Sequence, residues 1–186
     1  MNIFIDVGCH VGYYSFIWTK DPRNFVYAFE PIPHLYEDLK IHESRLKNFK
    51  VFPYAISEVD GFSDFYINEN LATCSLKEFV DKRFITKEKI TVPTKRLDTF
   101  CTEMSLQHIH TLKTDAQGSD LDVLKSMGDK LGICAHLLIE AFITDEDTYV
   151  DEVKRNDVIE YVTKRGFDFV SESIDGNYTD LRFQKK

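Results

Sequence analysis

The sequence lacks several features, and each absence argues against a class of protein. No apolar run approaches the about 18 residues that a membrane-spanning helix needs. None of the four cysteines forms a C-x-x-C pair, so neither a zinc site nor any other metal site is expected. No signal peptide opens the chain, and we interpret the cysteines as free thiols in a reducing, cytoplasmic compartment.

A basic run is also missing. The formal net charge is −8, the sequence pI is about 5.2, and the densest basic stretch, Lys82 to Arg96, is interrupted by Glu88. Neutralisation of phosphates supplies most of the non-specific affinity of nucleic-acid binders. The composition therefore disfavours a nucleic-acid partner, although an acidic protein can still carry a local basic groove.

Internal repeats and low-complexity linkers are absent from the 186 residues, which suit one domain over residues 1–186. Hydrophobic residues make up 43% of the chain, enough for a core without disulfides. Short apolar segments alternate with longer amphipathic ones, which predicts βαβ units and a mostly parallel sheet.

The expected elements follow this alternation, and two strands around an Asp-Gly turn close the chain as an antiparallel hairpin. The acidic segment 144–151 is expected to be a solvated loop or a helix start, and Asp157 with Glu160 predicts a capping box for the last helix, which Gly166 ends. Strands are expected over residues 2–6, 25–29, 50–54, 64–67, 89–92, 110–114, 135–140, 167–172 and 178–183. Helices are expected over residues 12–20, 33–46, 75–82, 97–103 and 119–127.

The turn after the first strand carries the strongest signal for a ligand site. The strand ends at Asp6, and Gly8 and Gly12 stand four apart before a helix, where backbone can approach a ligand closely. A dinucleotide site needs G-x-G-x-x-G, but His10 occupies the position of the middle glycine. A carboxylate such as Asp6 repels a pyrophosphate but can serve an ammonium, which favours S-adenosylmethionine over NAD.

Glu30 ends the second strand, at a position that lies over the ribose of a nucleotide in such folds. Its carboxylate can accept hydrogen bonds from both ribose hydroxyls. NAD and S-adenosylmethionine proteins share this feature, so only its combination with the Asp6–Gly8 turn discriminates between them. The alternative is that the glycine turn is simply a turn.

These residues resemble the FkbM family of class I methyltransferases. The matching segments run in family order and cover most of the chain: residues 5–14, 26–31, 54–57, 60–61, 96–98, 112–120, 123–124 and 138–140. The resemblance implies a Rossmann-like α/β fold with a mostly parallel seven-stranded sheet and a C-terminal antiparallel hairpin. It also implies S-adenosylmethionine as methyl donor and O-methylation of a sugar, a glycan or a glycosylated small molecule.

The resemblance further implies that Asp6 and Gly8 hold the methionine moiety, Glu30 the ribose and the segment 54–56 the adenine. Family members carry elements before the first strand, whereas this sequence begins at that strand. Either the site is open, another segment covers it, or a partner such as a second copy does. The expected cofactor-binding residues are Asp6, Gly8, His10, Gly12, Tyr13, Glu30, Pro31, Tyr54, Ala55, Ile56 and Asp115.

Candidate catalytic residues lie at the ends of later strands. Lys113 and Asp115 are two apart, so they face the same side of a strand, and Glu140 ends the next one. We expect a Lys113–Asp115–Glu140 cluster beside the transferred methyl, with Asp115 as base or substrate orienter. The alternative is a structural ion-pair network. His10 is a second candidate base, or a solvent-facing loop residue, and residues 68–93 are expected to determine specificity.

Three other functions stay open at this point. The first is methylation of RNA or protein, against which the acidity argues weakly. The second is a catalytically inactive S-adenosylmethionine-binding partner subunit. A nucleotide-dependent oxidoreductase is the third, and His10 argues against it because it interrupts the dinucleotide fingerprint.

Overall fold

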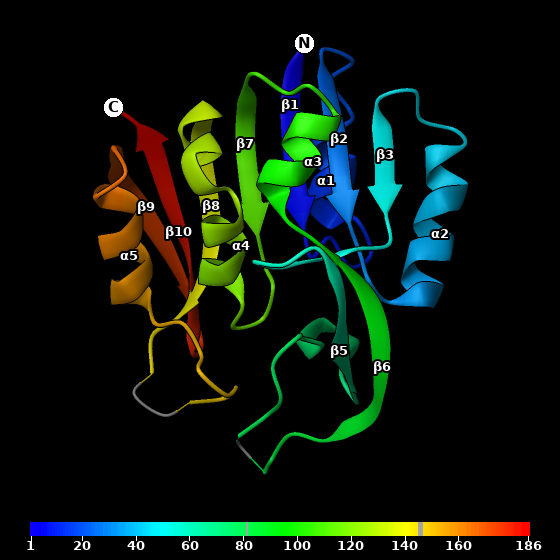
Figure 1. Cartoon of the computed structure of the whole chain (residues 1–186), viewed down its shortest axis with the longest axis vertical. Helices are drawn as coiled ribbons and strands as arrows, with labels where there is room; N and C mark the ends of the chain where they lie inside the picture. The colour runs from blue at the N-terminus through cyan, green and yellow to red at the C-terminus, as the bar shows by residue number, and fades with distance from the viewer. Residues whose placement is uncertain (81, 145–146) are drawn as a thin grey trace.

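A seven-stranded sheet forms the centre of the structure, a computed structural model that describes residues 1–80, 82–144 and 147–186. Its strands are β1 (Asn2–Val7), β2 (Asn24–Phe29), β3 (Phe49–Phe52), β7 (Ile109–Thr114), β8 (Cys134–Phe142), β9 (Phe167–Asp175) and β10 (Tyr178–Lys185). The order is β3-β2-β1-β7-β8-β10-β9, and β10 runs antiparallel to both neighbours while the other pairs are parallel (Figure 1). The expected Rossmann-like class I methyltransferase fold with its C-terminal hairpin is confirmed.

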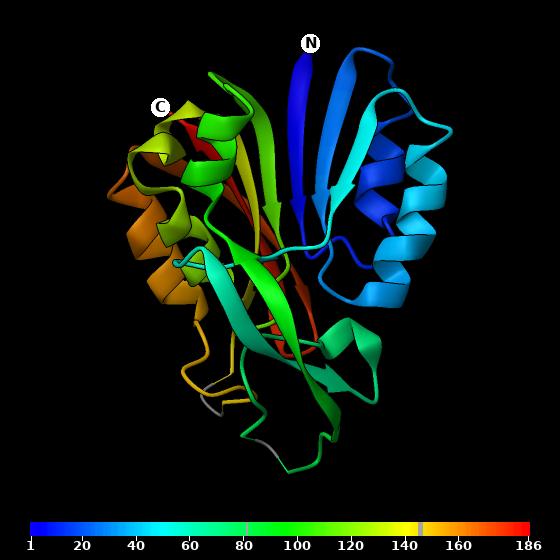
Figure 2. The ribbon, with the colours of Figure 1, turned by 45° about the vertical axis from the view of Figure 1, so that its right-hand side comes forward.

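Helices cover both faces of the sheet (Figure 2). On one face Leu39 packs against Phe4 and Val26, while Phe100 and Leu124 belong to the larger core on the other. Burial of these apolar stripes, rather than helix propensity, holds such short helices in place. The first face carries α1 (Tyr13–Trp18) and α2 (Pro33–Glu43), and the second carries α3 (Leu97–Glu103), α4 (Asp120–Ser126) and α5 (Arg155–Thr163).

A smaller sheet lies beyond the carboxyl ends of β1 and β2 (Figure 1). It consists of β4 (Ala55–Ile56), β5 (Gly61–Asn68) and β6 (Thr86–Lys95) in the order β4-β6-β5. Phe65, Cys74 and Val92 form its core together with Ile32 and Leu35 from the start of α2. The small sheet is thereby anchored beside the end of β2, where the predicted ribose-binding acid lies.

The prediction of a helix over residues 75–82 is wrong. Described residues of that segment are not helical: Ser75 pairs with Tyr66, and Phe79 pairs with Tyr149. Pairing with distant segments satisfies backbone groups that a helix would otherwise satisfy internally, so tertiary contacts override the local pattern. A short 3-10 helix, Leu71–Thr73, precedes this segment instead.

Three boundary predictions also need correction. Helix α5 begins at Arg155, so Asp157 lies inside its first turn and the predicted capping box with Glu160 does not form. Within the acidic segment, residues 145 and 146 lie outside the described part, and Tyr149 is buried rather than solvated. The strand predicted over 50–54 ends at Phe52, which frees residues 55–56 for the smaller sheet.

Gly8 lets the turn after β1 pass directly beside the end of β7. Its backbone is left-handed (φ +67°), and a Cβ there would lie 2.0 Å from the carbonyl oxygen of Asp115. Only glycine, which has no Cβ, lets the backbone at this position come so close to the carbonyl of Asp115.

We therefore expect Gly8→Ala to lower the free energy of unfolding by about 3 kcal/mol or more, because it adds a backbone clash to a left-handed conformation. Gly176→Ala is the matched control: its φ is +59° with open space around the Cβ position, and it should cost about 1 kcal/mol. Urea denaturation of both variants measures the difference. Equal losses would show that the close approach at Gly8 carries no energetic weight.

Candidate active site

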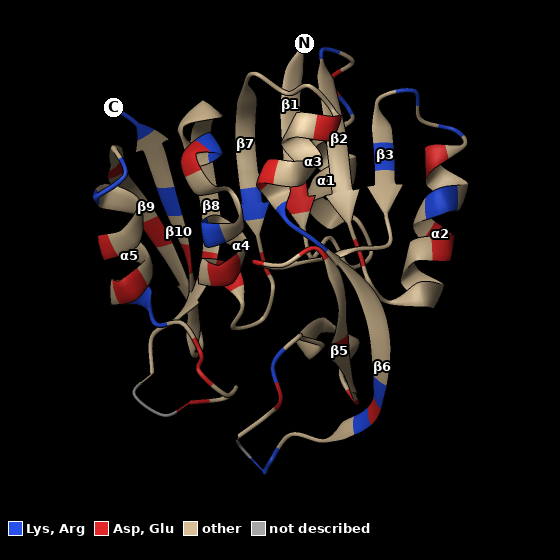
Figure 3. Cartoon of the chain, in the orientation of Figure 1, with Lys and Arg blue, Asp and Glu red and all other residues tan. Residues whose placement is uncertain are grey.

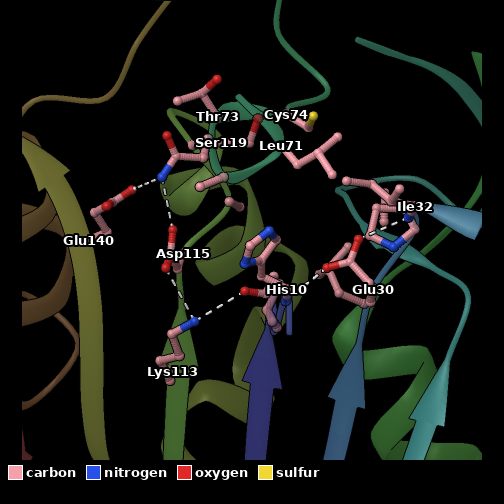
Figure 4. Close-up of a pocket in the computed structure, with 18 of the residues that line it drawn as sticks. His10, Glu30, Ile32, Leu71, Thr73, Cys74, Lys113, Asp115, Ser119 and Glu140 are labelled. Carbon is pink, nitrogen blue, oxygen red and sulfur yellow. Dashed lines mark hydrogen bonds and ion pairs between the residues drawn. The ribbon is translucent and has the colours of Figure 1, made fainter. Parts of the chain in front are cut away.

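A cavity of about 530 Å³ opens at the carboxyl ends of the parallel strands, within the range that small-molecule sites occupy. Its floor comes from the ends of β1, β2, β7 and β8, and its walls come from the smaller sheet and the β9–β10 hairpin. Figure 4 shows Lys113 and Asp115 on one strand, Glu140 on the next, and His10 facing Glu30. Ligands bind at this edge in open α/β sheets.

Glu30 lies in the cavity wall just beyond β2 and is only 3% exposed. Its two carboxylate oxygens accept hydrogen bonds from the backbone N–H groups of His10 (2.8 Å) and Ile32 (2.9 Å) (Figure 4). Burial raises the pKa of Glu30 to about 7, although these two N–H groups act in the opposite direction. Each oxygen keeps a lone pair for a further donor, which suits a vicinal diol.

Lys113 is a buried ammonium with three partners. Its Nζ lies 3.2 Å from Asp6 Oδ1 and 3.4 Å from Asp115 Oδ2, and it donates to the Gly8 carbonyl at 3.2 Å. Burial alone would lower the pKa of Lys113, but the two carboxylates outweigh it and hold the pKa above its usual value. Asp6 is fully buried behind Lys113 and also accepts from Ser15 Oγ at 2.7 Å.

Asp115 and Glu140 face each other across the side-chain amide of Gln117. Gln117 Nε2 donates to Asp115 Oδ1 at 2.9 Å and to Glu140 Oε2 at 2.7 Å. Burial raises the pKa of Glu140 well above its usual value, and the charge of Asp115 raises it further. The structure thus brings the expected Lys113–Asp115–Glu140 residues together, with Gln117 as a link that the sequence did not indicate.

His10 also contributes its side chain to the cavity. Its backbone is left-handed (φ 50°), and burial lowers the pKa of its imidazole, so the ring is neutral near pH 7 and can accept a proton. The arrangement therefore offers two groups that could take a proton from an acceptor, the Asp115 carboxylate and the His10 imidazole.

Of the other expected cofactor-binding residues, some line the cavity and some do not. Gly8, Pro31 and the segment Tyr54, Ala55 and Ile56 line the cavity.

Asp6, Gly12 and Tyr13 are not part of the lining. Asp6 lies behind Lys113, Gly12 starts α1 in a left-handed conformation, and Tyr13 is 68% exposed on the outside of that helix. Asp6, which the resemblance assigns to the methionine moiety, acts on the cavity through Lys113.

Sequence reasoning missed the lining contributed by the β9–β10 hairpin, whereas Tyr14, which it considered as a lining residue, does line the cavity. β9 runs in the same direction as β8, so its carboxyl end and the hairpin turn reach the same edge as the ends of β7 and β8. Of the segment 68–93 that was expected to determine specificity, residues 70–74 and Leu76 reach the cavity. The hairpin residues in the lining are Ser173, Asp175, Tyr178 and Asp180.

Residues 6–169 match the Methyltransferase FkbM domain family, which covers most of the chain. The chain belongs to the FkbM methyltransferase family. The methyl donor of this family is S-adenosylmethionine, as the sequence analysis expected.

One curated relative is similar to the chain in sequence, and two solved structures are similar to it in fold. The 2-O-methyltransferase NoeI of Sinorhizobium fredii (strain NBRC 101917 / NGR234) is 26% identical over 163 residues, covering 79% of this chain and 65% of the relative, so the chain spans just under two thirds of that protein. Aeropyrum pernix fibrillarin with natively bound S-adenosyl-L-methionine shares the fold (TM-score 0.58, 13% identity, 98% of this chain and 65% of that chain). The N-terminal domain of EvdMO1, solved in the presence of SAH and D-fucose, does too (TM-score 0.54, 8% identity, 100% of this chain and 76% of that chain).

Two features are absent from residues 1–80, 82–144 and 147–186. No three His, Cys, Asp or Glu side chains in these ranges gather closely enough to hold a metal ion. No helix formed by these residues has the length and apolar character to cross a membrane. All four cysteines are buried free thiols, as predicted.

Lys113→Met should lower the free energy of unfolding by about 3–5 kcal/mol, because it leaves the buried Asp6 carboxylate without its cation. Lys125→Met is the matched control: Lys125 is partly exposed and lies 3.5 Å from Glu58 and Asp122, so its loss should cost less than about 1 kcal/mol. Chemical denaturation at pH 7 compares the two. Similar losses for both variants would contradict the structural role of Lys113.

Proposed function

We propose that the chain transfers the methyl group of S-adenosylmethionine to a hydroxyl of a sugar, a glycan or a glycosylated small molecule. The observation that carries this proposal is that one cavity contains both the Glu30 carboxylate and the Lys113–Asp115–Glu140 cluster. The first fits the nucleoside of the donor, and the second supplies a carboxylate beside the place where an acceptor would meet it. Transfer by in-line displacement needs chiefly this proximity and a group to take the hydroxyl proton.

The donor end of the cavity fits S-adenosylmethionine. Glu30 keeps acceptor capacity for the two ribose hydroxyls, and the segment 54–56 offers lining for the adenine. Gly8 lies in the lining, where its backbone can contact the methionine moiety, with Asp6 setting the charge behind it through Lys113. When bound, the donor supplies a methyl group that its positive sulfur already activates.

Acidic side chains line the acceptor end, although burial raises the pKa of Glu140 and of Asp180. Asp115, Glu140, Asp175 and Asp180 line it, against the single ammonium of Lys113. Carboxylates accept hydrogen bonds from hydroxyls, whereas they repel phosphate groups, so this end suits a neutral polyol better than RNA. In the view of Figure 3, basic and acidic residues are interspersed along the described part of the chain.

Asp115 is the proposed base. One of its oxygens faces Lys113 and the other faces Gln117, and its side chain is 37% exposed toward the cavity. It is therefore both oriented and accessible to an acceptor hydroxyl. His10 is the second candidate for the same role.

The similarity to a curated 2-O-methyltransferase supports O-methylation. An RNA or protein acceptor and an inactive cofactor-binding subunit remain the alternatives, and the acidic acceptor end and the complete carboxylate cluster speak against them. A second copy or another partner over the cofactor, and a cytoplasmic location, stay predictions.

Calorimetric titration at pH 8 should show saturable binding of S-adenosylmethionine and none of NAD. The affinity should fall about tenfold between pH 8 and pH 6, because protonation of Glu30, with its pKa of about 7, removes an acceptor for the ribose hydroxyls and leaves only the ionised fraction competent. Glu30→Gln is the control: it should bind weakly at both values, without the pH-dependent step. Binding that is independent of pH in the wild-type protein would contradict the role of Glu30.

Asp115→Asn should reduce kcat by about 10²- to 10⁴-fold, because the amide cannot accept the hydroxyl proton, while the Kd of S-adenosylmethionine changes little. Release of S-adenosylhomocysteine with a panel of neutral sugars and oligosaccharides measures turnover. The control, Asp180→Asn, should change the KM of the acceptor more than kcat. Unchanged turnover in Asp115→Asn, with loss in His10→Ala, would transfer the role of base to His10.

A further inference from the structure

The turn that follows β7 is held in a strained conformation from two sides. Gln117 and Gly118 are both left-handed, with φ of 50° and 87°, and such a conformation costs a non-glycine residue about 1–2 kcal/mol. Ser75 Oγ donates to the Gln117 carbonyl at 2.7 Å. The ring of Tyr149 covers Gly118, where a Cβ would come within 3.2 Å. Two segments far away in the sequence therefore fix this turn.

The turn directs the Gln117 amide between two carboxylates. Its Nε2 has two hydrogens, and each has an acceptor, Asp115 Oδ1 and Glu140 Oε2. Lys113 forms its ion pairs with Asp6 and Asp115. The hydrogen bond from Gln117 thus stabilises the charged form of Glu140, whose burial disfavours it.

Tyr149 fixes which way round the amide lies. The two carboxylates take the amide hydrogens, so Gln117 Oε1 points toward the Tyr149 hydroxyl. The single hydrogen of that hydroxyl is shared between the Thr73 carbonyl at 2.8 Å and Gln117 Oε1 at 3.1 Å. Tyr149 is 1% exposed, and its ring stacks on Phe79 with centroids 4.9 Å apart. Burial raises the pKa of Tyr149, so the hydroxyl keeps its proton and remains a donor.

We propose that Gln117 and Tyr149 are positioning residues for methyl transfer: together they hold the Asp115 carboxylate in the orientation that receives the acceptor's proton. This inference rests on the proposed function. Tyr149 acts through Gln117, because the cavity lining includes Gln117 and not Tyr149. Since Tyr149 also binds the Thr73 carbonyl, the same hydroxyl ties the wall of the smaller sheet to the base.

Two measurements on the same variants test the proposal. Carbon-detected NMR of the wild-type protein and of Gln117→Leu follows the titration of Glu140, whose midpoint should rise by about one pH unit when the amide donor is lost. With the sugar acceptor found in the turnover screen, kcat of Gln117→Leu should fall about 10²-fold, with the Kd of S-adenosylmethionine within about threefold of the wild-type value. Gln107→Leu, at an exposed glutamine outside the cavity, should change neither.

Two further variants separate positioning from general stability. Gln117→Glu donates only when protonated, so its kcat relative to the wild-type value should fall as the pH rises. Tyr149→Phe keeps the ring and should lower kcat about tenfold, and the Gln117→Leu/Tyr149→Phe double variant should be no slower than Gln117→Leu, since both act through one amide.

The possible outcomes distinguish this inference from the proposed function. A wild-type protein that methylates no acceptor overturns the proposed function, and the inference with it. An active wild-type protein overturns the inference alone if Glu140 titrates unchanged in Gln117→Leu, if the two losses in kcat multiply, or if Gln117→Glu keeps the wild-type pH profile.

Discussion

A single buried ammonium, that of Lys113, determines how the site is assembled. Taking this charge out of water costs several kcal/mol unless its partners are close and well oriented. The partners come from two places: Asp6 and the Gly8 carbonyl from β1 and its turn, and Asp115 from the strand end beside it. The register of the sheet puts Asp6 directly opposite Lys113. A slip of one residue would turn Lys113 into the apolar core on the other face and separate all four groups.

The requirement to neutralise Lys113 also explains why the carboxylates at this edge differ in character. Asp6 is buried and paired with Lys113, so its charge serves to neutralise that ammonium. Asp115 shares the same cation but reaches the cavity. Glu140 lies farther from Lys113, whose charge still opposes the rise in pKa that burial causes, and accepts a hydrogen bond from the amide of Gln117. Three carboxyl groups with similar pKa values in water thus occupy three different environments. One edge of the sheet can therefore hold a structural carboxylate beside one that is accessible to a ligand.

The sequence predicted the parts of the site that depend on strand periodicity. Glu30, Lys113 and Asp115 were found because a parallel strand presents its ends at one edge and alternates its side chains. Contacts between distant segments were not predictable in this way: the segment 75–80 pairs with residues around Tyr149 instead of forming a helix. The role of Gln117 depends on a left-handed turn, which no propensity of glutamine indicates. Asp6 was assigned to the ligand because the pattern shows its place on a strand but not the lysine in front of it.

The direction of the last two strands has a consequence for how the cavity could change in shape. Because β9 is parallel to β8 and β10 returns antiparallel, the turn between them lies at the edge of the cavity without any crossover helix. Gly176, in that turn, has open space around it. Insertions and substitutions there can reshape this wall of the cavity, while the strands below it stay in register. A change confined to one hairpin turn therefore alters the shape of the cavity without moving Lys113 or the turn that carries Gly8.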